Sequence, residues 1–400
     1  MATNGYGKGQ RKAGDTLEDR KGSMEDLVGK SRLAHAFKGG KVLVTGHTGF
    51  QGGWLCLWLD MLGADVMGFG LEPEKGEWPT IFDVVRPSSN MKSITGDIRS
   101  RNLVREVVRD FKPDYVIHLA AQALVDTSIE QPVYTLETNV MGTVNLLDAV
   151  LSYDAPRAVL AVTSDKCYKA TGKNNTAFTE NAPLGGRDPY SASKACAEIV
   201  VHSFMSSFMN SHLGRNKPVF GIATARSGNV IGGGDWAESR LVPDCVKAFN
   251  AGKAVTLRMP QAVRPWQHVL QAISGYLWLL IKLGKDPGKF SGPWNMGPLD
   301  KSHVQVRQLV QIAGRCWGQS GDYVDHRTSD SVEEGLLLLD STKARSLLDY
   351  RQVWPLLTTV DKTIAWYKAC MQDRVDLLEL SMEQIQDFTK DARKLGLEWC

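Results

Sequence analysis

Tyr190 and Lys194 are the first residues in this sequence whose types and spacing suggest chemistry. Residues four apart share one face of a helix, so the two side chains are expected to lie together. An ammonium near a phenol stabilises the phenolate and lowers the tyrosine pKa, and a positively charged nicotinamide nearby would lower it further. The pair therefore predicts that Tyr190 can act as a base toward a hydroxyl group. A Tyr/Lys pair at this spacing is also common by chance, and the segments that follow are what favour a catalytic role.

A second polar group, Ser164, Asp165 and Lys166, directly follows the apolar run 158–162. A hydroxyl, an acid and an amine side by side can serve as hydrogen-bond donor, general acid and general base. The same residue types also form ordinary polar turns, and that is the alternative interpretation. The predicted position at the carboxyl end of a strand favours catalysis, because ligand sites in open α/β sheets lie there.

A glycine-rich segment around Gly46, Gly49 and Gly52 lies between the apolar run 41–44 and a helical pattern. Glycines at this spacing permit a tight turn and let a pyrophosphate approach the backbone N–H groups that begin the helix. A purely structural turn is the alternative, but the position between strand and helix favours nucleotide binding. Phe50 and Gln51 lie in the same loop and are predicted to contact the cofactor.

The acid expected after the second strand, to bind the ribose hydroxyls, is not obvious. Glu72 lies in range, either as that ligand or as a solvated loop carboxylate. No arginine follows the strand closely to receive a 2′-phosphate, so NAD is favoured over NADP.

Elements that would position these residues alternate along the first half of the chain. Apolar runs predict strands, and residues at helical spacing predict helices between them. The predicted strands are 41–44, 64–69, 115–119, 158–162 and 219–225, and the predicted helices include 99–111, 132–151 and 188–209. This alternation predicts an α/β fold with a doubly wound parallel sheet. Later helices are expected at 303–317, 341–349, 356–370 and 382–395.

The same pattern predicts the division of the chain. Residues 1–38 lack an apolar period and are expected to form a disordered tail. Residues 39–228 form the predicted NAD-binding domain, and 386–400 a C-terminal tail. Residues 229–385 are interpreted as mainly a smaller α/β substrate lobe, with some segments returning to the first domain.

Composition excludes several classes of protein. The chain has 47 basic and 44 acidic residues, and eight of the basic and five of the acidic ones lie in the first forty. The remainder is neutral, which argues against nucleic-acid binding. No apolar run is long enough for a membrane span. The seven cysteines lack Cys-x-x-Cys spacing, which indicates free thiols in the cytoplasm and no metal site.

The chain resembles the extended short-chain dehydrogenase/reductases that act on nucleotide sugars, which have a Rossmann-type fold, and among them most closely the CDP-glucose 4,6-dehydratases. The resemblance runs in order from residue 41 to about 370. The glycine loop and Tyr-x-x-x-Lys mark only the superfamily, whereas the runs 164–168 (Ser-Asp-Lys-Cys-Tyr) and 264–268 (Arg-Pro-Trp-Gln-His) are much narrower. The chain departs from the family pattern at 169–177, at 332–335 and in the first forty residues.

The resemblance implies further site residues. Asp97 and Ile98 would adjoin the adenine. Other implied contacts to NAD are Ala120, Ala121, Gln122, Asn139, Tyr190 and Lys194. Those implied to contact the substrate are Asn229, Arg240, Arg264 and His268. For the arginines, surface ion pairs are the alternative.

The implied reaction is dehydration of a nucleotide-activated hexose, with CDP-glucose as leading substrate. Tyr190 would take the C4 hydroxyl proton, Ser164 and Lys194 would polarise the reacting groups, and Asp165 would protonate the departing C6 hydroxyl. Lys166 would be either the base at C5 or a cation that stabilises the enolate. A 4-epimerase, a dehydratase for another nucleotide sugar, and a non-catalytic NAD-sensing or RNA-associated protein are the alternatives. The family also implies a homodimer or tetramer, paired through helices at 131–151 and 188–209.

Overall fold

The structure is a computed structural model, and it describes most of the chain from residue 31 onward. The described residues are 31–73, 75–86, 89–153, 156–169, 177–209, 220–298, 302–326, 337–372 and 375–400. The predicted disorder of residues 1–30 lies outside these ranges, as do residues 170–176 and 332–335 of the two internal departures.

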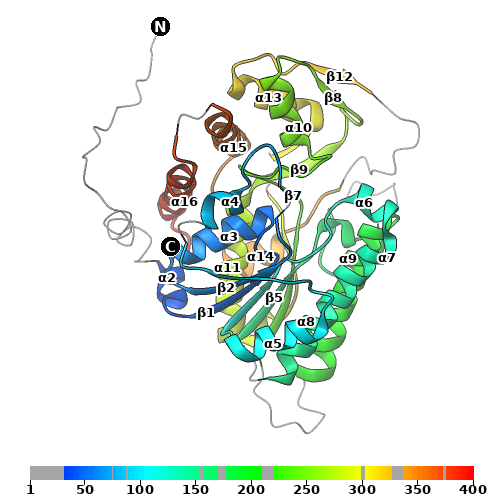
Figure 1. Cartoon of the computed structure of the whole chain (residues 1–400), viewed down its shortest axis with the longest axis vertical. Coiled ribbons are helices and arrows are strands. Elements are labelled where there is room, and N and C mark those ends of the chain that lie inside the picture. Colours follow the sequence, from blue (N-terminus) through cyan, green and yellow to red (C-terminus); the bar gives the residue numbers. More distant parts are fainter. Residues whose placement is uncertain are drawn as a thin grey trace, which may run out of the picture.

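A parallel sheet of seven strands forms the centre of the molecule, in the order β10-β6-β5-β4-β1-β2-β3 (Figure 1). Its strands are β1 (Lys41–Thr45), β2 (Asp65–Gly70), β3 (Lys92–Thr95), β4 (Tyr115–His118), β5 (Ala158–Val162), β6 (Gly221–Ser227) and β10 (Gly292–Met296). All neighbouring pairs run parallel. This order is that of a Rossmann sheet with one added strand, which confirms the predicted fold class.

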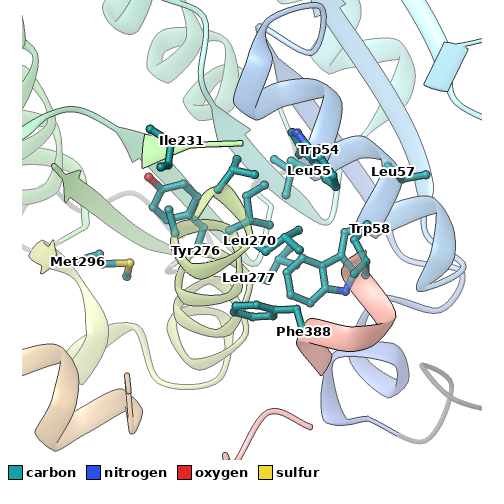
Figure 2. Packing of buried hydrophobic residues seen from close by; sticks show 14 of the residues in the cluster. Trp54, Leu55, Leu57, Trp58, Ile231, Leu270, Tyr276, Leu277, Met296 and Phe388 are labelled. Carbon is teal, nitrogen blue, oxygen red and sulfur yellow. The ribbon is translucent and has the colours of Figure 1, made fainter. Parts of the chain in front are cut away.

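Side chains of each central strand alternate between two cores, one on each face of the sheet. On β1, Val42 and Val44 enter one core while Leu43 enters the other. The first core contains α3 (Phe50–Met61) and α11 (Val269–Lys285), and the second contains α5 (Arg101–Phe111), α8 (Gly142–Ser152) and α9 (Pro189–Phe204). Figure 2 shows Trp54 and Trp58 of α3 among Leu270 and Leu277 of α11.

The helix predicted at 132–151 is divided by one wider turn. It begins as α7 (Pro132–Leu136), passes through a π-helical turn at Glu137–Met141 and continues as α8. The helix predicted at 188–209 is α9, followed by a second π-helical turn at Met205–Met209. Such turns often occur at functional sites, and the first one contains the predicted site residue Asn139.

The second half of the chain builds a smaller lobe beside the carboxyl ends of the central strands (Figure 1). One small sheet joins β7 (Asn229–Ile231), β9 (Val263–His268) and β11 (His303–Gln305), and another joins β8 (Val255–Leu257) to β12 (Tyr323–Asp325). The helices packed with them are α10 (Leu241–Asn250), α13 (Val306–Trp317) and α15 (Leu356–Met371). Strand β10 and helix α11 return to the central sheet.

Residues 31–38 and 386–400 are more ordered than the sequence suggests. Residues 32–37 form α2 (Arg32–Phe37), and α16 (Leu377–Lys394) runs through the predicted boundary at 386. The Leu33 N–H donates to the Trp399 carbonyl at 3.3 Å, and Trp399 packs against Trp58. The prediction that residues 31–38 and 386–400 are tails is therefore wrong, because apolar side chains anchor both segments to the core.

Within the described ranges, no helix is long and apolar enough to cross a membrane. Nor does that part of the chain bring three or more His, Cys, Asp or Glu side chains together in a way that suits a metal ion.

Candidate active site

One large cleft lies between the central sheet and the smaller lobe and encloses about 1630 Å³. Pockets for one drug-sized ligand typically enclose about 300–1,000 Å³, so this cleft has room for two. Most of the predicted site residues line it, namely Gly46, Gly49, Phe50, Gln51, Gly52, Asp97, Ile98, Ala120, Ala121, Ser164, Asp165, Lys166, Tyr190, Lys194, Asn229, Arg240 and Arg264. Strands far apart in sequence therefore bring the two predicted catalytic groups and the glycine loop to one place.

The glycine loop is built for close approach of backbone to backbone. Gly46 has a φ of +74°, and a Cβ there would lie 2.6 Å from the Ala120 nitrogen. A Cβ on Gly52 would meet the Gly46 carbonyl oxygen. The N-cap residue Gly49 supplies no side-chain hydrogen bond, so the first N–H groups of α3 are left for a ligand. This cradle fits the pyrophosphate of a dinucleotide.

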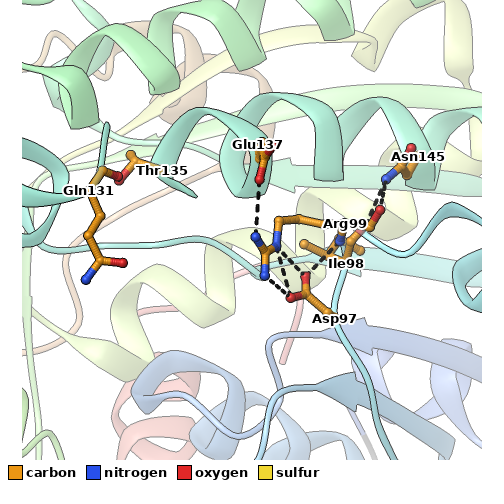
Figure 3. Close-up of polar contacts among 7 residues, drawn as sticks. All are labelled: Asp97, Ile98, Arg99, Gln131, Thr135, Glu137 and Asn145. Atoms are coloured by element: carbon orange, nitrogen blue, oxygen red, sulfur yellow. Dashed lines mark hydrogen bonds and ion pairs between the residues drawn. The ribbon is translucent and has the colours of Figure 1, made fainter. Parts of the chain in front are cut away.

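The loop after β3 forms the neighbouring wall, where Asp97 is held by Arg99 (Figure 3). Arg99 Nη2 donates to Asp97 Oδ2 at 2.7 Å, and this hydrogen bond lowers the pKa of Asp97. Asn145 Nδ2 donates to the Ile98 carbonyl at 3.0 Å. The loop is thus held from both sides. Glu72, the alternative ribose ligand, accepts from the Thr95 hydroxyl and is not in the cleft lining.

Gln122 and Asn139, predicted to contact the cofactor, are buried behind the cleft wall rather than in its lining. The Gln122 N–H donates to Asn139 Oδ1 at 2.8 Å, and Asn139 Nδ2 donates to the Gln122 carbonyl at 2.9 Å. Asn139 also donates to Ser193 Oγ at 2.8 Å. In this structure the two residues brace the segment of Ala120 and Ala121 against α9, and their contact with the cofactor stays a prediction.

Ser164 connects the predicted catalytic residues. Its Oγ donates to Asp165 Oδ1 at 3.0 Å and accepts from the Lys166 backbone N–H at 3.2 Å, and Ser164 also lowers the pKa of Tyr190. Lys194 Nζ lies 5.9 Å from the centre of the Tyr190 ring. The structure therefore assembles all five side chains at the carboxyl end of β5 and the start of α9.

Burial controls the electrostatics of this cluster. It raises the pKa of Asp165, so this carboxyl holds a proton more strongly than an exposed aspartate, as a general acid should. Burial also lowers the pKa of Lys194 to about 8. For Tyr190 the direction differs from the sequence-based expectation: burial raises its pKa, and the opposing effects come first from Arg240 and then from Ser164. The sequence pattern showed the Tyr/Lys spacing but not the desolvation.

A buried ion pair behind the cluster was not predicted from the sequence. Arg226 Nη2 and Glu198 Oε2 lie 2.7 Å apart, and both side chains are only 3% exposed. Glu198 also accepts from the hydroxyls of Thr163 and Thr224, while Arg226 Nη1 donates to the Tyr168 hydroxyl at 2.7 Å. Glu198 follows Lys194 by four residues on α9, and this spacing is the signal in the sequence that could have identified it.

Two of the predicted substrate contacts border the catalytic cluster from the smaller lobe. Arg264 acts electrostatically on Asp165, and Arg240 does so on Tyr190. Arg240 Nη2 also donates across the cleft to the Ala123 carbonyl at 3.3 Å. Asn229 begins β7 and lines the cleft beside them.

His268 does not join this group. It is 1% exposed, it caps α11 by accepting from the Leu270 N–H at 3.3 Å, and it packs between Trp54 and Trp354. Burial lowers its pKa to about 3, so it is a neutral core residue. The prediction that His268 contacts substrate is wrong, because β9 ends here and the chain turns into a helix.

The fold and the arrangement of this site are those of an enzyme that works on a substrate beside a bound dinucleotide. The chain belongs to the NAD dependent epimerase/dehydratase family, whose model matches residues 42–297. It is 42% identical over 352 residues to the CDP-glucose 4,6-dehydratase of Salmonella typhimurium, covering 88% of this chain and 97% of that protein.

Solved structures show the same fold at lower identity. The dTDP-glucose 4,6-dehydratase DesIV of Streptomyces venezuelae, with NAD and TYD bound, has a TM-score of 0.69 at 24% identity and covers 84% of this chain and 99% of its own. The UDP-glucose 4-epimerase of Thermotoga maritima, with UDP-glucose, has a TM-score of 0.70 at 20% identity and covers 82% and 99%. The fold alone therefore does not separate dehydratases from epimerases, and the catalytic cluster must do so.

Proposed function

We propose that this protein is an NAD-dependent hydro-lyase that converts CDP-glucose to CDP-4-dehydro-6-deoxyglucose. The observation that carries the proposal is the buried Asp165 carboxyl, which accepts a hydrogen bond from Ser164, lines the same cleft as Tyr190 and holds its proton through desolvation. The 42% identity to a CDP-glucose 4,6-dehydratase supports the choice of reaction and of nucleotide.

The glycine cradle at Gly46, Gly49 and Gly52 and the Asp97 loop would hold NAD, which when bound would supply reversible hydride transfer for the sugar. Tyr190 accepts the proton of the C4 hydroxyl. Lys194 supplies positive charge beside the phenol. Because Tyr190 has a raised pKa in the protein alone, Arg240 and Ser164 are the groups of this chain that favour its ionised form.

Dehydration needs an acid at C6 and a base at C5. Asp165 protonates the departing C6 hydroxyl, since its raised pKa keeps the proton available. Lys166 lines the cleft on the same 3-10 turn as Asp165. Its proposed role at C5 is either that of the base or that of the cation that stabilises the enolate. The two roles for Lys166 remain alternatives.

An epimerase on the same fold shares Tyr190, Lys194 and NAD but needs no acid at C6. The paired Asp165 and Lys166 therefore favour dehydration over 4-epimerisation. A non-catalytic protein would not need the buried cluster around Asp165 and Tyr190, so this alternative is not favoured.

The test is to incubate the protein with CDP-, dTDP-, GDP- and UDP-glucose and follow the product by mass spectrometry. CDP-glucose should lose one water without any added reductant, because the hydride taken from C4 returns to C6. Asp165→Asn should abolish water loss while leaving oxidation at C4. Formation of an epimer without water loss would favour the epimerase instead, and a strict need for stoichiometric reductant would contradict the dehydratase.

We also propose that the protein forms a homodimer through α7 and α9, which pack against each other. Several large apolar side chains on these helices are exposed, including Val133 at 67% and Ile199 at 57%. Leu147 of α8, by contrast, is part of the core behind the sheet. Sedimentation at micromolar concentration should give a dimer, and Val133→Glu with Ile199→Lys should give monomer. Leu357→Glu, at an equally exposed site on α15, is the control that should stay dimeric.

A cytoplasmic location completes the proposal. All seven cysteines are free, as expected in a reducing compartment. Localisation of the tagged protein by fractionation tests it, and recovery with secreted proteins would contradict it.

A further inference from the structure

We propose that Arg258 and Asp244 recognise the cytosine base of the substrate and so set its nucleotide specificity. Both residues line the large cleft on the side of the smaller lobe. The inference rests on the proposed function and adds the residues that select the nucleotide.

Arg240 marks the part of the cleft nearest the catalytic cluster, because its charge acts on Tyr190. The positions of Asp244 and Arg258 can be described relative to it. Asp244 lies one helical turn further along α10, with its N–H donating to the Arg240 carbonyl at 3.1 Å. Arg258 directly follows β8, and its Nη2 donates to Ser239 Oγ at 3.0 Å, beside Arg240 in the chain. A substrate with its sugar at Tyr190 and its diphosphate at Arg240 would extend its nucleoside toward this pair.

The lining of this end of the cleft also holds the polar residues Asp126, Glu238, Ser239 and Thr256, together with a group of apolar side chains. Leu241 and Pro243 of α10, Leu257 and Met259 around β8, and Val306 of α13 line it. Such side chains can sandwich the faces of a base but do not distinguish one base from another. Discrimination must come from polar groups that meet the base edge, and Arg258 and Asp244 supply a donor set and an acceptor set there.

The edge of cytosine suits this pair. Cytosine presents an exocyclic amine that donates and a ring nitrogen and a carbonyl oxygen that accept. A carboxylate accepts from the amine, and the guanidinium fork donates to the two neighbouring acceptors. Uracil and thymine have a carbonyl oxygen where cytosine has the amine, and a ring N–H where cytosine has the accepting ring nitrogen. Their carbonyl oxygen would therefore face the Asp244 carboxylate, and their ring N–H would face Arg258. The pair therefore favours CDP-sugars over UDP- and dTDP-sugars.

The two side chains line the same cleft and their charges influence each other. Partial burial raises the pKa of Asp244, Lys247 and then Arg258 lower it, and Glu238 raises it. Asp244 is exposed as a whole residue, so its carboxyl can reach a ligand although part of it is covered.

Arg258 also forms an exposed ion pair with Asp126, and breaking this ion pair costs little stability. Its Nη1 lies 3.6 Å from Asp126 Oδ2 across the cleft, and the two side chains are 56% and 53% exposed. Exposed ion pairs of this kind contribute little to stability. Arg258 can therefore release Asp126 and bind the edge of a base with little loss of stability.

The test compares kcat/KM for CDP-, UDP- and dTDP-glucose in the wild type, Asp244→Asn, Arg258→Gln and Arg258→Lys. Each variant should lose roughly tenfold to hundredfold in kcat/KM for CDP-glucose, mainly through KM, while the values for the other two substrates change less. Arg258→Lys keeps the charge but not the fork, so it should behave like Arg258→Gln. Lys247→Gln and Asp126→Asn are matched controls that should keep the wild-type preference.

Titration calorimetry of CDP and UDP into the folded holoenzyme gives a second readout that does not depend on turnover. The preference for CDP should fall in the Asp244 and Arg258 variants only. If the wild type dehydrates CDP-glucose and the variants keep its full selectivity, the inference is overturned and the proposed function stands. If Arg258→Lys is the one variant that keeps the selectivity for CDP-glucose, Arg258 supplies only charge, and its proposed role in recognising the cytosine edge is overturned. If the wild type does not act on CDP-glucose, both fail.

Discussion

The ion pair between Glu198 and Arg226 offers the sharpest test of how this active site is supported. Glu198→Gln keeps the size of the side chain but leaves the Arg226 charge without its partner at a site where both groups are 3% exposed. Removing one member of a buried ion pair costs about 3–5 kcal/mol, a large part of a typical stability of about 5–15 kcal/mol. We expect Glu198→Gln to lower the free energy of unfolding by that amount.

The same change should alter the pH dependence of catalysis. Glu198 raises the pKa of Lys194, which burial lowers to about 8. At about 6 Å and an effective dielectric constant of about 20, the attraction between two such charges is about 3 kcal/mol, or about two pKa units. Without it the pKa of Lys194 falls. Because activity that needs the ammonium is lost as pH rises through this pKa, the alkaline limb of kcat should move to lower pH.

Urea unfolding at neutral pH and pH–rate profiles with CDP-glucose measure the two effects. Glu106→Gln on α5 is the control, because it makes the same chemical change at an exposed position and should stay within about 0.5 kcal/mol of the wild type. The double variant Glu198→Leu with Arg226→Met should recover more than half of the lost stability, since it removes both charges. A Glu198→Gln protein as stable as Glu106→Gln, with an unmoved alkaline limb, would refute the reasoning.

Three further predictions concern the cleft and the core. Lys166→Met should still oxidise C4 but stop before water is lost, seen as lasting absorbance of reduced nicotinamide without a change in sugar mass. A wild-type dehydration rate would make Lys166 a structural residue only. Gly52→Ala should weaken NAD binding roughly tenfold or more, because its Cβ meets the Gly46 carbonyl; fluorescence titration with NAD measures this, and Gly288→Ala is the control that should bind normally. Burial lowers the pKa of His268 from 6.5 to about 3, so the unfolded chain binds more protons in that window and stability should fall as pH falls through it. Urea midpoints at several pH values test this, and His268→Asn should show a smaller fall.

Much of the fold and the catalytic cluster could be predicted, because the relevant signals are local in the sequence. The glycine loop lies between a strand and a helix, and Tyr190 and Lys194 share a helix face, so spacing alone placed them. Neither prediction needed to know which distant segments meet. The alternation of strands and helices along the sequence was likewise enough to predict the parallel sheet.

The errors arose where burial or a change of element decides the outcome. Residues two apart on a strand point to the same face, so His268 was expected on the same side of β9 as the cleft residues Arg264 and Trp266. The strand ends at His268, however, and the residue caps α11 instead. The direction of the Tyr190 pKa shift depends on desolvation, which no spacing reveals. The hydrogen bonds between Gln122 and Asn139 are likewise not visible in the sequence pattern.

The chain ends were missed for a related reason. The segment with Leu33 and Phe37 is too short for a helical period to stand out, and its partner Trp399 lies at the other end of the sequence. A contact between such distant residues leaves no local pattern.

The place of β10 in the central sheet has a consequence for synthesis of the protein. Every residue of β6 is buried, and β10, the strand that covers its outer edge, comes much later in the chain. Until a ribosome has produced residues 292–296, the nascent chain carries the edge of β6 with unpaired backbone groups, which invites association with other chains. Chaperone shielding of that edge would therefore matter most late in translation, after the catalytic residues have already emerged.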